Sequence, residues 1–272
     1  MSAPHCRPAV HRRAPSAPVP PGRTTAPPAC AMRRTLLRLA LAVGVIALAL
    51  LLAPAAQAQV PQTDTPMRIG IIGTGNIGGG LARHWVEAGH EVMISSRNPD
   101  QLVSLAEELG PRAQVGTPRE AAAWGEVVLV SVPYAATPQI GEDYAEELTG
   151  KLVIDTGNPV ERRDGPMALD ALDMGTGLAS AQYLHSARVV RAYTCIPAAT
   201  LRGQAHLEPP LAIPLAGDDV EALEIAQRLV RDSGFDPVVV GPLERASEFD
   251  LGTELAAATG NINADEMRRM LE

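Results

Sequence analysis

The sequence is poor in aromatic side chains, which make up 3% of its 272 residues, and it holds only three cysteines, Cys6, Cys30 and Cys195. The cysteines form neither a CxxC motif nor a paired framework, so the sequence supports neither a disulfide scaffold nor a cysteine zinc site. The core must therefore be built from Val, Leu, Ile and Ala. Hydrophobic residues make up 46% and charged residues 20% of the chain, proportions that are typical of a globular protein.

Acidic residues are missing from the first 58 positions, which carry seven arginines. Without this segment the formal net charge of −8 becomes −15. Such a negative body argues against nucleic acid or an anionic membrane surface as a partner. Any phosphate that the protein binds must therefore be held by groups at its binding site, because the overall charge of the protein repels it.

The first 58 residues contain two segments of different character. Residues 1–31 are rich in Pro, Ala and Arg, which is typical of a disordered segment or of a start codon assigned too early. Residues 32–58 predict a secretory signal, with paired arginines, an apolar run and cleavage after Ala58. We expect export to the periplasm or another extracytoplasmic compartment, with the twin-arginine route as an option. The alternative is an uncleaved N-terminal anchor, which would then be the only contact with the membrane.

A dinucleotide-binding fingerprint follows this segment. The apolar strand 67–72 leads into Gly73-Thr74-Gly75-Asn76-Ile77-Gly78, and a helix then continues to Gly89. Gly73 permits a tight turn, Gly75 lets a pyrophosphate approach the backbone, and Gly78 lets the helix pack close to the strand. Backbone N–H groups at the start of the helix can hold the phosphates without any lysine or arginine.

The tip of the second strand lacks the acid that NAD-binding proteins place about 20 residues after the glycines. The chain has Ser95-Ser96-Arg97-Asn98 there. A carboxylate would repel an adenosine 2′-phosphate, whereas Ser96 and Arg97 can hydrogen-bond to it. The sequence therefore predicts a site for NADP(H). The alternative for Arg97 is a solvated loop arginine.

Apolar strands alternate with amphipathic helices along the rest of the chain, which predicts an α/β fold with a doubly wound, mostly parallel Rossmann sheet. We expect strands over 67–72, 91–95, 113–115, 126–132, 151–155, 188–194, 211–216 and 236–240. We expect helices over 98–109, from 118, over 137–148, 178–187 and 197–204, from a cap at Asp218 to 232, and over 243–257, with a loop over 161–173. Residues 67–160 form the dinucleotide-binding core in this interpretation, and residues 161–272 form the remainder of the domain with a small C-terminal α/β extension.

Several blocks of the sequence resemble the NADPH-dependent coenzyme F420 reductases and the related domain of membrane ferric reductases. The blocks occur in the family's order: "MRIGIIGTGNIGGGLARHWVEAGHEVMISSRNP", "LVIDTGNPV", "ARVVRAYTCIPAATL" and "PLAGDDVEALEIAQRLVRDSGFDPVVVGPLERA". The resemblance covers about residues 67–250. It implies hydride transfer between NADP(H) and a small-molecule redox acceptor, without a catalytic acid–base residue. The acceptor would be a deazaflavin such as coenzyme F420, a flavin or a flavin-coupled ferric centre. We expect no metal site.

The resemblance also implies positions for the cofactor. Thr74, Asn76 and Ile77 would line the pyrophosphate turn, and Ser96 with Arg97 would hold the 2′-phosphate. Val132 and Pro133 would flank the cofactor, and Asn158 and Pro159 would lie near the nicotinamide. The chain departs from the family at residues 192–197, where "AYTCIP" replaces a common "AFNT" and a later glycine, so the acceptor stays open.

Few other residues are candidates for chemistry. Because hydride transfer depends mainly on positioning, the lack of an evident acid–base group agrees with this interpretation. We expect His84 to be packed or solvated, Cys195 to be a buried structural thiol, and His206 to lie near the acceptor side. A non-catalytic exported module that binds a nucleotide or a partner protein is the alternative function, and a homodimer is one option for the assembly.

Overall fold

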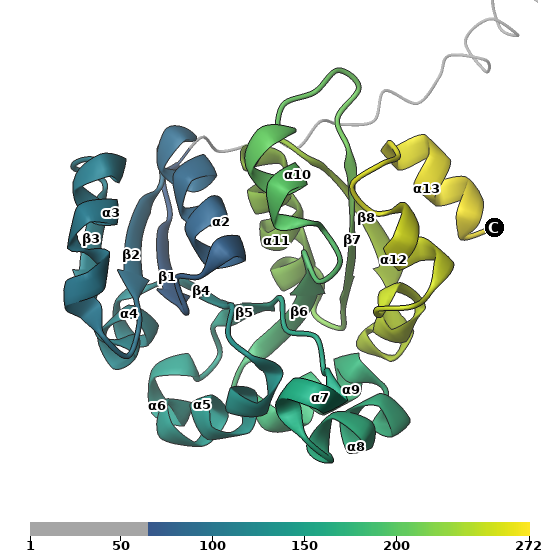
Figure 1. Ribbon diagram of the computed structural model, residues 1–272, viewed down its shortest axis with the longest axis horizontal. Coiled ribbons are helices and arrows are strands. Elements are labelled where there is room, and N and C mark those ends of the chain that lie inside the picture. The colour runs from purple at the N-terminus through teal and green to yellow at the C-terminus, as the bar shows by residue number, and fades with distance from the viewer. Residues whose placement is uncertain (1–64) are drawn as a thin grey trace, which may run out of the picture. The chain divides into compact units, whose positions relative to one another are not determined.

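The computed structural model describes residues 65–272, so the predicted disordered segment over 1–31 and the predicted signal over 32–58 lie outside the described residues. The described part contains an eight-stranded sheet in the order β3-β2-β1-β4-β5-β6-β7-β8 (Figure 1). Neighbouring strands are parallel except for the antiparallel pair β6 and β7. The predicted fold class, a doubly wound and mostly parallel Rossmann sheet, is confirmed. The strands are β1 (Arg68–Ile72), β2 (Glu91–Ser95), β3 (Ala113–Gly116), β4 (Val127–Val130), β5 (Leu152–Asp155), β6 (Arg188–Ala192), β7 (Ala212–Gly217) and β8 (Asp236–Gly241).

The register of the parallel strands brings their carboxyl ends to one edge of the sheet. Ile72 pairs with Ser95 on one side and with Val130 on the other. Val130 pairs with Asp155, and Asp155 pairs with Arg191. The segments that follow β1, β2, β4, β5 and β6 therefore share this edge, which is where open α/β sheets bind their ligands.

Helices cover both faces of the sheet. One face packs against α2, α3, α10 and α11, and the other packs against α4, α5, α6 and α9. The helical elements are α2 (Asn76–Glu87), η1 (Pro99–Leu102), α3 (Val103–Leu109), α4 (Pro118–Trp124), η2 (Tyr134–Ala136), α5 (Thr137–Asp143), α6 (Ala145–Leu148), α7 (Glu161–Asp164), α8 (Met167–Met174), α9 (Thr176–Tyr183), α10 (Ala198–Gly203), α11 (Val220–Asp232), η3 (Leu243–Phe249), α12 (Glu254–Ala258) and α13 (Ala264–Met270).

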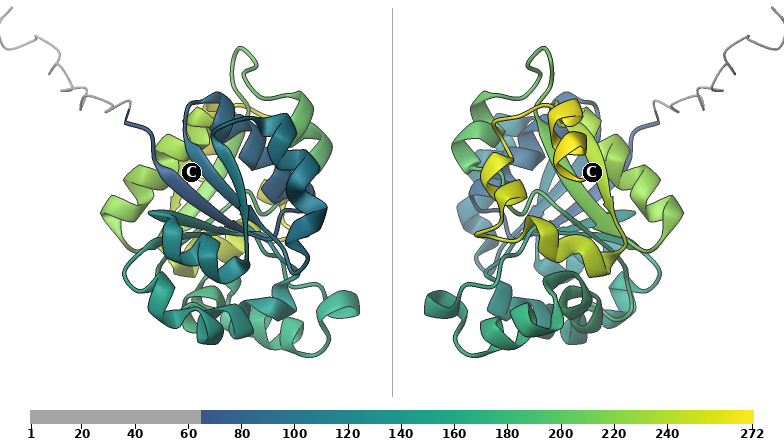
Figure 2. Two further views of the ribbon diagram at one scale, coloured as in Figure 1. Left: turned by 90° about the vertical axis from the view of Figure 1, so that its left-hand side faces the viewer. Right: turned by 90° about the vertical axis from the view of Figure 1, so that its right-hand side faces the viewer.

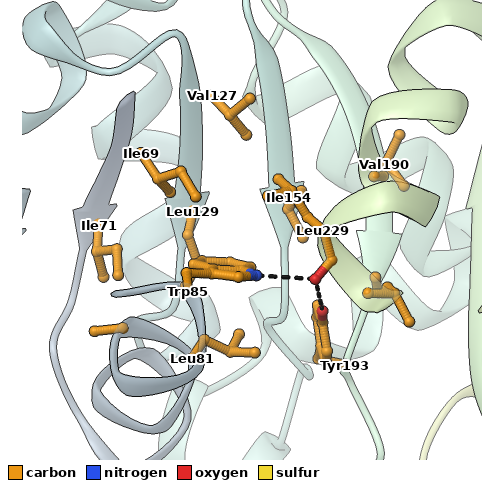
Figure 3. Packing of buried hydrophobic residues seen from close by; sticks show 14 of the residues in the cluster. Ile69, Ile71, Leu81, Trp85, Val127, Leu129, Ile154, Val190, Tyr193 and Leu229 are labelled. Carbon is orange, nitrogen blue, oxygen red and sulfur yellow. Dashed lines mark hydrogen bonds between the residues drawn. The ribbon is translucent and has the colours of Figure 1, made fainter. Parts of the chain in front are cut away.

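The core of the first face is mainly aliphatic, and the polar atoms of Trp85 and Tyr193 within it are hydrogen-bonded. Trp85 from α2 is fully buried, and its indole N–H donates to the Leu229 carbonyl at 2.9 Å. The Tyr193 hydroxyl donates to the same carbonyl at 3.3 Å (Figure 3). It also lies 2.9 Å from Ser233 Oγ. These contacts tie α2 and the end of β6 to the last turn of α11.

The C-terminal segments cover the outer part of the sheet. Phe249 from η3, Leu255 from α12 and Met267 from α13 pack against Ala216 of β7 and Val240 of β8. Figure 2 shows these segments, in yellow, beside β8. The predicted helical tail over 243–257 is thus divided between η3 and α12, and α13 is an addition that the sequence analysis did not foresee.

The prediction of a loop over 161–173 is wrong, because α7 and most of α8 occupy this segment. Gly165 and Pro166 suggested irregular backbone. In the structure Gly165 ends α7 with φ +72°, and Pro166 is the N-cap of α8. Asp164 stabilises the first of these helices, because its carboxylate accepts hydrogen bonds from the backbone N–H of Val160 at 2.8 Å and of Ala135 at 3.3 Å.

Two smaller expectations are also corrected. The cap of α11 is Asp219, whose carboxylate accepts from Ala222 N at 2.7 Å, whereas Asp218 accepts from the backbone N–H of Leu243. The helix expected over 137–148 is broken at Tyr144, where φ is −118°. The cap of α4 is as predicted, since Thr117 and Glu120 form a capping box. No helix among residues 65–272 is long and apolar enough to cross a membrane.

Candidate functional site

The turn after β1 is fixed by one backbone carbonyl at the end of β2. The Ser95 carbonyl accepts hydrogen bonds from the backbone N–H groups of Gly73 and Thr74, both at 3.2 Å. It also accepts one from the Thr74 hydroxyl at 3.0 Å. Ser95 itself is buried, and its hydroxyl donates to the Ile71 carbonyl at 2.6 Å. These hydrogen bonds therefore hold the glycine-rich turn and the end of β2 in a fixed relative position.

The three glycines of the fingerprint differ in what requires them. At Gly73, φ is +96°, and a Cβ would lie 2.4 Å from the Ser131 carbonyl oxygen. At Gly78, a Cβ would lie 2.3 Å from the Gly73 carbonyl oxygen. At Gly75, a Cβ would meet nothing within 4 Å, and φ is −90°. The fold thus accounts for the first and third glycines but not for the second, which borders open space.

Helix α2 begins beside this open space without any cap of its own. Gly75, its N-cap, supplies no side chain, and no acidic residue lies in the first turn. The first N–H groups of an α-helix have no partner within the helix, and they carry the positive end of its dipole. Asn76, Ile77 and Gly78 are at this end of α2, so the structure offers a place for a phosphate group there.

The tip of β2 lies directly beside the turn. Ser96 is half-buried and its hydroxyl accepts from the Asn98 backbone N–H at 3.1 Å, while Arg97 is exposed. Residues 95–98 contain no carboxylate. Because Ser95 is bonded to Gly73 and Thr74, the predicted 2′-phosphate ligands Ser96 and Arg97 adjoin the predicted pyrophosphate turn.

The remaining predicted site residues follow β4 and β5 at the same edge. Val132 lies against the turn, since a Cβ on Gly73 would be 2.7 Å from its Cγ1, and the next residue, Pro133, is exposed. Pro159 is buried. The Asn158 amide donates to the Thr194 carbonyl, while the buried Asn158 Oδ1 has no hydrogen-bond partner. Buried polar atoms are rarely left unsatisfied, so this oxygen marks a place for a donor from a ligand.

The other candidates have structural contacts. Nε2 of the buried His84 lies 2.7 Å from the Leu201 carbonyl oxygen. The ring of His206 is 6.2 Å from that of His84 and packs over Gly234. The Cys195 thiol donates to the Phe249 carbonyl at 2.8 Å, and burial raises its pKa, so it remains a thiol at neutral pH. Residues 65–272 hold no group of His, Cys, Asp and Glu side chains that could bind a metal.

The sequence did not predict a buried ionic network that contacts the loop after β5. Arg191 is fully buried, and its guanidinium donates to Asp155 at 2.7 Å and to the Gly157 carbonyl at 2.7 Å. Its other terminal nitrogen lies 3.5 Å from Asp250, whose carboxylate also accepts from the Thr176 hydroxyl. Asp155 in turn accepts from the Gly157 backbone N–H at 2.8 Å.

This network fixes the loop that carries Asn158. The backbone N–H of Gly157 donates to Asp155 and its carbonyl accepts from Arg191. Asp250 links the C-terminal segment to the same network through Arg191. Removing one partner of such a buried pair typically costs about 3–5 kcal/mol, because a charge is left uncompensated. Burial also raises the pKa of the Tyr134 hydroxyl, which lies 3.0 Å from Ser180 at the margin of the network, to about 12.

The sequence is similar to those of known NADP oxidoreductases. The family described as "NADP oxidoreductase coenzyme F420-dependent" matches residues 68–159. An F420-dependent NADP reductase of Methanothermobacter marburgensis is 31% identical over 205 residues, which are 70% of this chain and 90% of that protein. The metalloreductase STEAP3 of Rattus norvegicus is 30% identical over 200 residues, which are 71% of this chain but only 37% of the rat protein.

Solved structures share the fold. The crystal structure of the hypothetical protein SMa0349 from Sinorhizobium meliloti has a TM-score of 0.61 at 25% identity and covers 70% of this chain and 92% of that one. A putative F420-dependent NADP reductase from Arthrobacter sp. FB24 has a TM-score of 0.56 at 24% identity, covering 66% and 87%.

The glycines provide a test of whether the open space is a ligand site. We expect Gly78→Ala to lower the free energy of unfolding by about 2 kcal/mol or more, since the added methyl overlaps a backbone oxygen. We expect Gly75→Ala to change it by less than about 1 kcal/mol, as alanine is only a somewhat poorer N-cap, yet to weaken NADPH binding by about tenfold or more. Urea unfolding and calorimetric titration measure the two quantities. Unchanged NADPH affinity in Gly75→Ala would show that the space is not used.

Proposed function

The chain belongs to the family of coenzyme F420-dependent NADP oxidoreductases, and we propose that it transfers a hydride between NADP(H) and a deazaflavin, a flavin or a flavin-coupled ferric acceptor. Family membership makes it an NADP oxidoreductase with a small-molecule redox acceptor. The choice of acceptors rests on the named relatives, of which two are an F420-dependent NADP reductase and a metalloreductase. Coenzyme F420 is the first candidate, because this chain spans 90% of the F420-dependent relative.

The main support for NADP(H) as the cofactor comes from the residues at the end of β2. The Ser95 carbonyl bonds to Gly73 and Thr74, so the following residues are held beside the turn. A hydroxyl on Ser96 and a guanidinium on Arg97 take the place of the carboxylate that a ribose 2′-hydroxyl would need. A guanidinium binds phosphate through two parallel N–H groups, which favours NADP(H) over NAD(H).

The residues present also fit the rest of an NADP(H) molecule. The open space at Gly75 would admit the diphosphate against the first N–H groups of α2. The unpartnered Asn158 Oδ1 would accept a hydrogen bond from the carboxamide of the nicotinamide. Bound NADPH supplies the hydride, and the protein contributes orientation and exclusion of water. The ionic network of Arg191, Asp155 and Asp250 would act by keeping the Asn158 loop in place.

Arg97→Asp tests the cofactor preference. A carboxylate at this position repels the 2′-phosphate, so we expect NADPH affinity to fall by about tenfold or more while NADH affinity changes by less than about threefold. Calorimetric titration with both nucleotides measures the ratio. Arg112→Asp, before β3 at the opposite edge of the sheet, serves as the control for the change in net charge. Equal losses for both nucleotides in Arg97→Asp would remove the argument from the 2′-phosphate.

The acceptor is tested by mixing the protein and NADPH with coenzyme F420, with FAD or FMN, and with a ferric chelate plus flavin, each in turn. We expect oxidation of NADPH, followed by its absorbance, with reduction of one equivalent of the deazaflavin or flavin. Mixtures without protein give the background rate. Tight NADPH binding without oxidation by any of these acceptors would instead support the non-catalytic module.

We propose in addition that residues 32–58 direct export and are removed after Ala58. The support is the basic segment, the apolar run and the Ala56-Gln57-Ala58 pattern. The mass of the protein isolated from its natural source should then correspond to a chain that begins at Gln59. A mass that includes residues 32–58 would favour an N-terminal anchor or a protein that is not exported.

A further inference from the structure

A cation from the C-terminal half of the chain lies at the start of α2. Arg202 belongs to α10 and is 126 residues away from Asn76 in sequence. Its guanidinium nitrogen Nη1 lies 3.3 Å from Oδ1 of Asn76, the first residue of α2. The fingerprint from Gly73 to Gly78 contains no basic residue of its own. Helix α10 therefore brings a positive charge to the place where the fingerprint predicts two phosphates.

Three contacts hold α10 against α2 and so define the position of Arg202. Leu201 is fully buried in the core. Its carbonyl oxygen lies 2.7 Å from Nε2 of His84 on α2. Gly80 allows the close approach, because a Cβ there would lie 3.1 Å from Leu201 Cδ2 and 3.6 Å from Arg202 Cγ. Gly80 lies after the three glycines of the fingerprint. The close contact between α2 and α10 explains why this position holds a residue without a side chain.

The guanidinium is available to a ligand. Arg202 is exposed, and no Asp or Glu among residues 65–272 forms a salt bridge with it. The first turn of α2 also lacks an acidic residue. An arginine carries five N–H donors, and the contact with Asn76 uses one of them. The charge at this end of α2 is therefore uncompensated by the protein.

We infer that Arg202 binds the diphosphate of the dinucleotide and closes the site from the side of α10. This inference rests on the proposed function, since it requires NADP(H) at the glycine-rich turn. It assigns different phosphates to the two arginines. Arg97 recognises the adenosine 2′-phosphate and sets the preference for NADP(H), whereas Arg202 recognises the part that NADPH and NADH share.

The experiment compares Arg202→Gln with the wild-type protein against three ligands by calorimetric titration. NADPH contains both phosphate groups, NADH contains only the diphosphate, and adenosine 2′-monophosphate contains only the 2′-phosphate. We expect Arg202→Gln to weaken NADPH and NADH alike by about tenfold, the effect of one charge-assisted contact at a partly solvated site. Binding of adenosine 2′-monophosphate should change by less than about twofold.

The control is Arg112→Gln, which removes the same charge at the opposite edge of the sheet and should leave all three affinities within about twofold. Arg202→Lys should recover part of the loss, since it restores the charge but not the planar fork. Unchanged binding of NADPH and NADH by Arg202→Gln would overturn the inference. So would a loss of adenosine 2′-monophosphate binding as large as that of NADPH. A wild-type protein that binds neither dinucleotide would instead refute the proposed function, and the inference with it.

A second pair of variants tests the position of Arg202 without removing it. Gly80→Ala pushes against Leu201 and the stem of Arg202, so we expect it to weaken NADPH and NADH equally and by several-fold. Gly79→Ala meets only ordinary contacts, at 3.7 Å from Thr74 and 3.8 Å from Leu105, and should bind both as the wild type does. Equal affinities of the two variants would contradict a role for the docking of α10.

Discussion

The carbonyl oxygen of Ser95 is the point on which the geometry of the candidate site depends. It accepts hydrogen bonds from two backbone N–H groups of the glycine-rich turn and from the Thr74 hydroxyl. These bonds join the end of β1 to the end of β2, so the turn and the residues that follow Ser95 cannot move independently. The distance between the proposed diphosphate region and the proposed 2′-phosphate region is therefore set mainly by backbone hydrogen bonds.

The other half of the site is fixed by buried charges. Arg191 links β5, β6 and the C-terminal segment through Asp155, the Gly157 carbonyl and Asp250. A buried ion pair adds little net stability compared with apolar packing, but its geometry is strict because each partner is costly to leave unpaired. This property suits the loop of Asn158, where hydride transfer would demand that a nicotinamide be held in one orientation.

The sequence predicted the local features well and missed those that depend on distant residues. The fingerprint, the capping box at Thr117 and most strands were predictable because their signals lie within a few residues. The network of Asp155, Arg191 and Asp250 spans 95 positions, and a lone arginine in an apolar strand does not reveal its partners. Helices α7 and α8 were missed because Gly165 and Pro166 suggested a loop, whereas they mark the boundary between two short helices. The docking of α10 on α2 was likewise invisible, since it depends on Gly80 meeting Leu201.

An acidic protein that binds a highly charged anion needs local sources of positive potential. Beyond about 8–10 Å salt screens the carboxylates elsewhere on the surface, so the groups near the phosphates determine the affinity. In the proposed site these sources are the N-terminus of α2, Arg97 and Arg202. The first is part of the fold itself. Arg97 follows Ser95, whose carbonyl is hydrogen-bonded to the turn, and Arg202 lies on α10, whose Leu201 packs close to Gly80 of α2. In the proposed arrangement affinity and cofactor preference can change independently, because one arginine is assigned to the shared diphosphate and the other to the distinguishing 2′-phosphate.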